Sequence, residues 1–237
     1  VYKRQVEGSG VSADGMLAAW HGRWEQARVY YERDFKRQQD ILGVGRTPSF
    51  VMELGAVLLR LDDQASFRTH CELFLDCYEG TDSTWYQLHS TAKTFLIAPA
   101  QPGHPLLAKA VALARRASEH PDREEWALPW DALTRGMAEY RAGEHVEADR
   151  WLSHAEKGVP GCRCTALAFR ALCALQRSEL EEAKAWLREA EQALPPGEDG
   201  HGAWFDIVFA EIAIDEARGV LGELMSESSV RLEQPEH

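Results

Sequence analysis

Apolar residues recur three and four positions apart along nearly the whole chain, which is the spacing of helices that turn one face toward a core. Strict alternation of apolar and polar residues, the pattern of a half-buried strand, is absent. Glycine and proline clusters divide the chain into stretches of roughly 12–17 residues, the usual length of a helix. These clusters lie at 43–48, 80–83, 99–105, 121, 143, 158–161 and 195–202. The pattern therefore predicts an all-helical chain, made of similar helices joined by short turns.

The clearest sign of a repeat lies in the second half of the chain. Four positions recur at a spacing of 35 residues, from 148 to 183 for the first pair. The pairs are Ala148 with Ala183, Leu152 with Leu187, Ala155 with Ala190, and Pro160 with Pro195. Small side chains at fixed intervals let neighbouring helices approach closely, and proline ends a unit because it cannot continue the helix. We therefore expect helix pairs that stack in a regular array.

The unit from Asp131 to Pro160 resembles a tetratricopeptide repeat, whose period is about 34 residues. Gly136 takes the small position of its first helix, and a turn follows at Gly143. Weaker units precede it at 17–31, 54–78 and 85–119. The resemblance implies an all-α fold, a right-handed α-solenoid of antiparallel helix pairs that covers residues 12–220.

The two ends of the chain differ from these units. Apolar residues between Ala203 and Gly219 predict a closing helix that caps the stack, and the polar segment 221–237 predicts a disordered tail. Residues 1–5, Val-Tyr-Lys-Arg-Gln, resemble the translation of a sequencing adaptor. We therefore expect these five residues to be non-native and the chain to be a fragment that begins near Val6.

Several segments resemble the C-terminal helical region of large bacterial serine/threonine protein kinases and related WD-repeat proteins. These segments are Phe67–Cys71, Ser90–Thr94, Gly136–Gly143 and Glu182–Leu187, and the similarity extends over roughly residues 16–220. The resemblance implies an interaction region of a cytoplasmic signalling protein. The chain lacks a glycine-rich nucleotide loop, a His-Arg-Asp loop and an Asp-Phe-Gly motif. We therefore expect no kinase activity in this chain, whatever an upstream part of the parent protein carries.

Charge and cysteine content narrow the possible partners and the compartment. The formal net charge of −12 argues against nucleic acid and against anionic membrane surfaces, since both need a basic footprint. No run of about 18 apolar residues predicts a membrane span. The five cysteines show no regular framework, which favours reduced thiols in the cytoplasm.

Motifs that would carry chemistry are missing. The nine histidines form no His-Glu-x-x-His zinc motif, and no Gly-x-Ser-x-Gly elbow is present. The acidic clusters at 122–125 and 179–182 each open a predicted helix, where carboxylates favour the positive end of the helix dipole. The sequence therefore predicts no enzyme activity, no metal site and no cofactor.

In tetratricopeptide arrays the first helix of each pair lines the concave face, and this pattern selects a candidate protein-binding groove. Its residues are Met52, Leu59, Arg60, Trp130, Leu133, Met137, Tyr140, Arg141, Leu172 and Gln176. The groove would be apolar with a basic edge. Leu133 and Met137 stand where relatives that bind peptide C-termini use lysine and asparagine, which argues against a carboxylate clamp. The groove therefore predicts a protein or peptide partner, such as an apolar helix or strand, including one from the same polypeptide.

Three functions remain open at this stage. The first is a non-catalytic protein-interaction scaffold from a bacterial signalling protein. The alternative is an effector-sensing helical repeat domain of a bacterial transcriptional activator, which a DNA-binding domain elsewhere in the parent would favour. The third is an all-helical enzyme acting on glycans, which would need paired carboxylates facing into a deep pocket.

Overall fold

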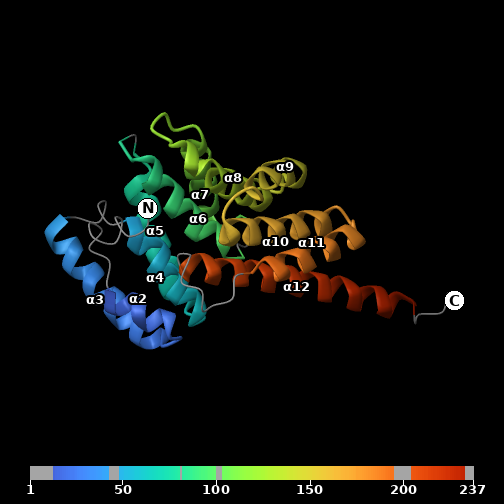
Figure 1. The fold of residues 1–237 in the computed structure, drawn as a ribbon, viewed down its shortest axis with the longest axis horizontal. Helices are drawn as coiled ribbons and strands as arrows, with labels where there is room; N and C mark the ends of the chain where they lie inside the picture. The colour runs from blue at the N-terminus through green and yellow to red at the C-terminus, as the bar shows by residue number, and fades with distance from the viewer. Residues whose placement is uncertain (1–12, 43–47, 81, 100–102, 195–203, 233–237) are drawn as a thin grey trace.

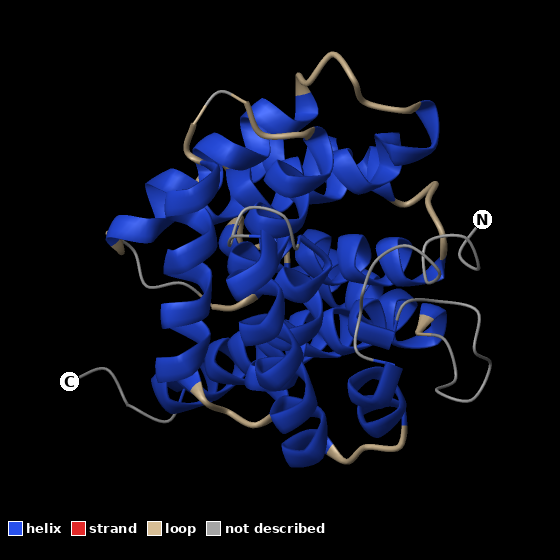
Figure 2. Cartoon of the chain, turned by 90° about the vertical axis from the view of Figure 1, so that its left-hand side faces the viewer, coloured by secondary structure: helices blue, strands red, loops and turns tan. Residues whose placement is uncertain are grey.

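A computed structural model describes residues 13–42, 48–80, 82–99, 103–194 and 204–232 (Figure 1). Within these ranges every regular element is helical and no strand occurs (Figure 2). The prediction of an all-α chain is confirmed. The longer helices are α2 Ala13–Trp20, α3 Trp24–Leu42, α4 Pro48–Arg60, α5 Gln64–Tyr78, α6 Trp85–Ile97, α7 Pro105–Ser118, α8 Leu128–Arg141, α9 His145–Ala155, α10 Pro160–Gln176, α11 Leu180–Ala193 and α12 Trp204–Leu232. A short 3-10 helix, η2, spans Glu125–Ala127.

Local sequence signals set where several of these helices begin. The Asp63 carboxylate accepts a hydrogen bond from the backbone N–H of Ser66 at 3.0 Å and so caps α5. Thr84 and Gln87 form a capping box at the start of α6. Pro105 and Pro160 occupy the first turns of α7 and α10, where a missing N–H costs nothing. The capping box explains why α6 begins at Trp85, where the sequence analysis begins the unit 85–119.

Successive helices pack against one another along the chain, and the even-numbered helices also contact each other in order: α4 with α6, α6 with α8, and α8 with α10. At Gly136 in α8, an added Cβ would lie 2.6 Å from Cγ of Leu152 in α9. Glycine is therefore required for the close crossing of α8 and α9, as the repeat pattern predicts. Gly55 differs, because its added Cβ would collide with Thr94 of α6 rather than with α5.

Helix α12 lies along the other helices rather than at the end of the series. It packs mainly on α10 and also contacts α4, α6 and α11, which are far apart in the sequence (Figure 1). The expectation of a helix that caps the stack is therefore corrected. The helix also continues to Leu232, whereas the sequence analysis expects a disordered tail from residue 221; no proline interrupts it before Pro235.

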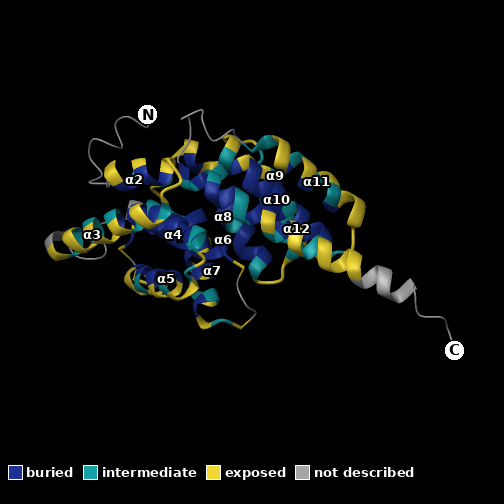
Figure 3. Ribbon diagram, turned by 90° about the horizontal axis from the view of Figure 1, so that it is seen from below, coloured by how far each residue is buried: buried dark blue, intermediate teal, exposed yellow. Residues whose placement is uncertain are grey.

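One continuous apolar core joins all these helices, from Ala18 in α2 to Ala217 in α12. A smaller cluster lies beside it at the end of α10 and the start of α11, where Ala174, Leu175 and Ala183 are packed by Val220 and Leu221. Residues 204–217 of α12 belong to the main core, and residues 218–226 are largely exposed (Figure 3). In the described part of the chain, no helix combines the length and apolar character needed to cross a membrane.

Candidate interaction site formed around helix α12

Charged residues from three different helices converge on α12. We call the surface they form the α12 interface and define it by Arg60 of α4, Lys93 of α6, Arg141 and Trp130 of α8, and Gly161 of α10. At Gly161 an added Cβ would lie 3.1 Å from Cβ of Asp206, so this glycine lets α12 approach α10 closely. Each of the three cations meets a carboxylate of α12, and the contacts are described in turn below.

The deepest contact joins Lys93 to Asp206. Lys93 Nζ lies 2.5 Å from Asp206 Oδ1, and the two side chains are only 3% and 10% exposed. Aromatic rings enclose the ammonium: its Nζ is 4.0 Å from the centre of the Trp130 ring, and the rings of Phe205 and Phe209 are also close. Burial raises the pKa of the Asp206 carboxyl above its usual value, although the Lys93 ammonium opposes this. The pair is therefore held in an apolar surrounding where each charge depends on the other.

The second contact is a two-pronged ion pair between Arg141 and Glu216. Arg141 Nη1 and Nη2 donate to Oε1 and Oε2 of Glu216, the latter at 2.6 Å. Arg141 also donates from Nε to the carbonyl oxygen of Leu96 at 3.0 Å and from Nη2 to that of Ile97 at 3.3 Å. These carbonyls belong to the last turn of α6, where carbonyl groups have no N–H partner within their own helix. Arg141 thus ties α8, α6 and α12 together at one point.

The third contact, between Arg60 and Glu211, is more exposed. Arg60 Nη2 pairs with Glu211 Oε2, and the two side chains are about one third exposed. The guanidinium also lies over the ring of Trp24, 5.8 Å from its centre. Arg60 is the last residue of α4, where a cation favours the negative end of the helix dipole.

The three carboxylates point to three sides of α12. Asp206, Glu211 and Glu216 are five residues apart, and five residues turn a helix by about 500°, or 140° beyond one full turn. The apolar residues between 204 and 217 are likewise distributed all round the helix. A helix that is apolar on all sides is normally enclosed by protein. This pattern is the sequence signal that indicates an enclosed helix rather than a cap.

The start of α12 packs near the Glu53 carboxyl, a buried polar group. The ring of Trp204 lies 6.0 Å from Trp24 and 6.2 Å from Tyr31, both in α3. Glu53 Oε2 of α4 is buried beside Tyr31 without a hydrogen-bond partner. Burial raises the pKa of Glu53 to about 8, since no cation compensates it. The Glu53 carboxyl is therefore mostly protonated at neutral pH.

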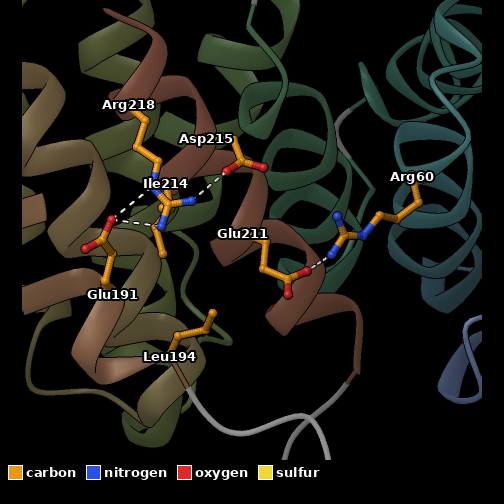
Figure 4. A pocket seen from close by; sticks show the side chains of 7 residues that line it. All are labelled: Arg60, Glu191, Leu194, Glu211, Ile214, Asp215 and Arg218. Atoms are coloured by element: carbon orange, nitrogen blue, oxygen red, sulfur yellow. Dashed lines mark hydrogen bonds and ion pairs between the residues drawn. The ribbon is translucent and has the colours of Figure 1, made fainter. Parts of the chain in front are cut away.

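A small pocket of about 230 Å³ lies between α4, α11 and α12 (Figure 4). Its lining residues are Arg60, Glu191, Leu194, Glu211, Ile214, Asp215 and Arg218. Arg218 pairs with Glu191 at 2.8 Å and with Asp215 at 3.1 Å, and Arg60 pairs with Glu211 (Figure 4). Each charged group in this pocket is thus ion-paired within it, and the three carboxylates outnumber the two guanidinium groups. The pocket is also smaller than the usual ligand site of about 300 Å³ or more.

A second polar cluster, between α6 and α8, resembles a catalytic group only superficially. Thr134 Oγ1 lies 3.1 Å from His89 Nδ1, and Asp131 Oδ1 lies 3.9 Å from the same nitrogen. A triad needs its nucleophile and its acid on opposite nitrogens of the imidazole, so a proton cannot be relayed here. All three side chains are buried, and Trp85 Nε1 donates to Asp131 Oδ1 at 2.5 Å. This cluster is part of the core.

The cysteines of the Cys-Arg-Cys segment are also core residues. Cys162 Sγ is 3.4 Å from the carbonyl oxygen of Pro129, and Cys164 Sγ is 3.1 Å from that of Ala190. Burial raises the pKa of the Cys164 thiol to about 12 and that of the Cys162 thiol further. Neither thiol has the low pKa of a reactive cysteine. Among the residues the structure describes, no group of three or more His, Cys, Asp or Glu residues is placed to hold a metal ion.

No family model, curated protein or solved structure matches this chain. The resemblance to tetratricopeptide and kinase-associated regions therefore rests on the quoted segments alone. A functional interpretation depends on the geometry around α12.

The residues predicted for the groove fall into three groups. Arg60, Trp130 and Arg141 contact residues of α12 or its ion-paired partners. Gln176 is exposed at the end of α10. The remaining residues are buried or half-buried in the core: Met52, Leu59, Leu133, Met137, Tyr140 and Leu172. The structure thus brings the basic edge of the predicted groove together but leaves most of its apolar positions inaccessible.

The sequence analysis missed Lys93 and the three carboxylates of α12. Lys93 lies in an apolar run, between Ala92 and the buried residues Phe95, Leu96 and Ile97. A single charge inside such a run predicts a buried ion pair, because an unpaired ammonium is costly to bury. The identity of its partner could not be read from this local pattern.

Proposed function

We propose that this chain is a non-catalytic protein-interaction scaffold of the tetratricopeptide type, a right-handed α-solenoid whose even-numbered helices form the receptive face. The observation that carries the proposal is the position of α12 across α4, α6 and α10. A helix laid against a row of other helices is a common mode of protein recognition. The α12 interface therefore has the form of a receptor with a helical ligand already in place.

The chemistry of the site supports binding rather than catalysis. The three cations of the interface are each paired with a carboxylate, and the buried His89 cluster lacks the geometry of proton relay. The odd number and irregular spacing of the five cysteines support a cytoplasmic location. The resemblance to helical regions of bacterial serine/threonine kinases supports a setting in signalling.

Site-specific photo-crosslinking tests this proposal. A photoreactive residue is placed at Gln176, the exposed position of the predicted groove, and in a second protein at Arg150, whose side chain is 76% exposed on α9. We expect adducts with one defined protein from position 176 and none from position 150. Direct binding of that protein, purified, to the full chain then confirms the contact. Adducts that form equally from both positions, or from neither, would overturn the proposed receptive face.

A further inference from the structure

We propose that α12 is an internal occupant that a partner protein replaces with an acidic helix of its own. The partner helix would carry three carboxylates five residues apart, with apolar residues on its other sides. This inference rests on the proposed scaffold function and adds the chemistry of the ligand and the means of regulation. When α12 is docked, it blocks the α12 interface. When α12 leaves, the partner helix binds in its place.

Charge complementarity defines the ligand. The chain carries a net charge of −12, yet the α12 interface presents Arg60, Lys93 and Arg141 toward the helix it holds. Their counter-charges in this interface come from α12. A neutral apolar helix would leave the Lys93 ammonium buried without a counter-ion, which is strongly unfavourable. The interface therefore selects acidic helices and fixes their register, since each cation reaches one position only.

The same ion pairs favour exchange over permanent docking. Two of them are nearly enclosed, with side-chain exposures of 3% and 10% for Lys93 and Asp206, and 5% and 10% for Arg141 and Glu216. Buried ion pairs add selectivity but little net stability, because loss of hydration offsets most of their attraction. The apolar side chains of α12 supply its attraction to the core, and the ion pairs decide which helix and which register fit.

The fully buried contacts of α12 come from a short part of the helix, whereas Val220 and Leu221 pack on the two apolar clusters while only half-buried. Between residues 204 and 226, the buried positions of this helix all lie from Trp204 to Ala217, whereas Arg218, Gly219, Gly222 and Glu223 are exposed. A partner needs to supply only about four helical turns to reproduce these contacts. Such segments are common as single recognition helices in protein partners.

A peptide exchange experiment with the full chain tests this inference. The probe is a fluorescent synthetic peptide with the sequence of residues 204–226, and binding is followed by fluorescence anisotropy. In the chain, Glu216→Arg places like charges at Arg141 and weakens the internal helix. We expect this variant to bind the peptide at least tenfold more tightly than the unmodified chain. The matched control is Glu223→Arg, the same change at an exposed position of α12, which should leave peptide affinity unchanged.

A second peptide tests the carboxylate pattern itself. It carries Asp206→Asn, Glu211→Gln and Glu216→Gln, and we expect it to bind the Glu216→Arg chain at least tenfold more weakly than the first peptide. Equal affinity of the two peptides would show that the cations do not select the ligand and would overturn the proposal. So would equal affinity of the modified and unmodified chains for the first peptide.

Two further outcomes separate the alternatives. If sedimentation shows that the unmodified chain is a dimer and that the peptide converts it to monomers, a second copy supplies the helix, and the partner proposal fails. If Glu216→Arg and the milder Glu211→Arg both abolish cooperative unfolding and the peptide does not restore it, α12 is a permanent core element. Crosslinking from Gln176 does not require release of α12, so either result leaves the test of the scaffold function intact.

Discussion

Two ion pairs of the same length have different surroundings in this molecule. Lys93 Nζ and Asp206 Oδ1 are 2.5 Å apart in the α12 interface, and Arg163 Nη2 and Glu189 Oε1 are 2.5 Å apart between α10 and α11. The inner side chains are 3% and 10% exposed, whereas the outer ones are 47% and 41% exposed. Water solvates the outer charges whether or not they meet. Each inner charge is compensated mainly by the other, so removal of one of them lowers the stability of the fold.

The comparison shows that distance alone does not measure what an ion pair contributes. The outer pair joins two helices that already pack through Cys164, Ala190 and Leu187. The inner pair decides which helix can lie in the α12 interface and in which register. Selectivity therefore comes from the Lys93–Asp206 pair, although loss of hydration offsets most of what this pair contributes to net stability.

The largest effect is expected when one partner of the inner pair is removed. Lys93→Met leaves the Asp206 carboxylate buried without its cation, and we expect a loss of about 3–5 kcal/mol in the free energy of unfolding. Urea unfolding followed by circular dichroism measures it. The double variant Lys93→Met with Asp206→Leu should recover most of the loss, since no charge remains buried. The matched outer variant Arg163→Met should change stability far less, and equal losses at the two sites would break the comparison.

A smaller effect, of opposite sign, is expected at the unpaired inner carboxyl of Glu53. Its pKa is about 8 in the folded chain and near 4.5 when unfolded. Between these values the unfolded chain releases a proton that the folded chain retains, so the stability of the fold decreases as pH rises. At pH 8 the two pKa values correspond to about 4 kcal/mol. Glu53→Gln removes this pH dependence but leaves a buried amide without a partner, so it should stabilise the fold by about half of that, on the order of 2 kcal/mol.

Unfolding curves from pH 5 to pH 9 measure the effect of Glu53→Gln, with Glu223→Gln as the exposed control. The variant should gain little at pH 5, because this pH lies only just above the pKa of the unfolded carboxyl and little of the pH dependence has yet accumulated. A variant whose stability follows the same pH curve as the unmodified chain would show that Glu53 ionises freely.

Geometry rather than charge is tested at Arg141. Arg141→Lys keeps the cation but loses the two-pronged contact with Glu216 and hydrogen bonds to the carbonyls of Leu96 and Ile97. We expect a loss of about 1–2 kcal/mol, and faster amide hydrogen exchange around residue 216 in α12. The same substitution at Arg163 should leave both quantities nearly unchanged. Equal exchange rates in the two variants would show that Arg141 acts only as a point charge.

Much of the fold could be predicted because it depends on local patterns. The unit predicted at 85–119 begins with α6 and ends one residue after α7. The 35-residue offset identified the buried positions of α9 and α11. The sequence analysis assigned Gly136 to a close helix crossing, and a Cβ at this position would collide with the side chain of Leu152. Each of these features is decided within one helix pair, so neighbouring residues contain the information.

The site was harder to predict because it joins residues far apart in the chain. Lys93 and Asp206 are separated by 113 positions, and Arg141 and Glu216 by 75. Periodicity shows which faces of a helix are covered but not which helix covers them. The register of the even-numbered helices therefore led to Leu133 and Met137, which are buried in the core, while the cations at the α12 interface were only partly identified.

The smallest effect is expected from the outer pair itself. A double-mutant cycle with Arg163→Ala and Glu189→Ala should give a coupling energy of about 0.2–1 kcal/mol, because both charges remain solvated when apart. The coupling should fall toward zero in about 0.5 M NaCl, where screening acts over a few ångströms. A cycle on Lys93 and Asp206 should give a larger coupling that salt barely changes, since ions cannot enter the enclosed site. If salt weakened both couplings equally, the inner pair would be open to solvent, and the selectivity assigned to the α12 interface would lose its physical basis.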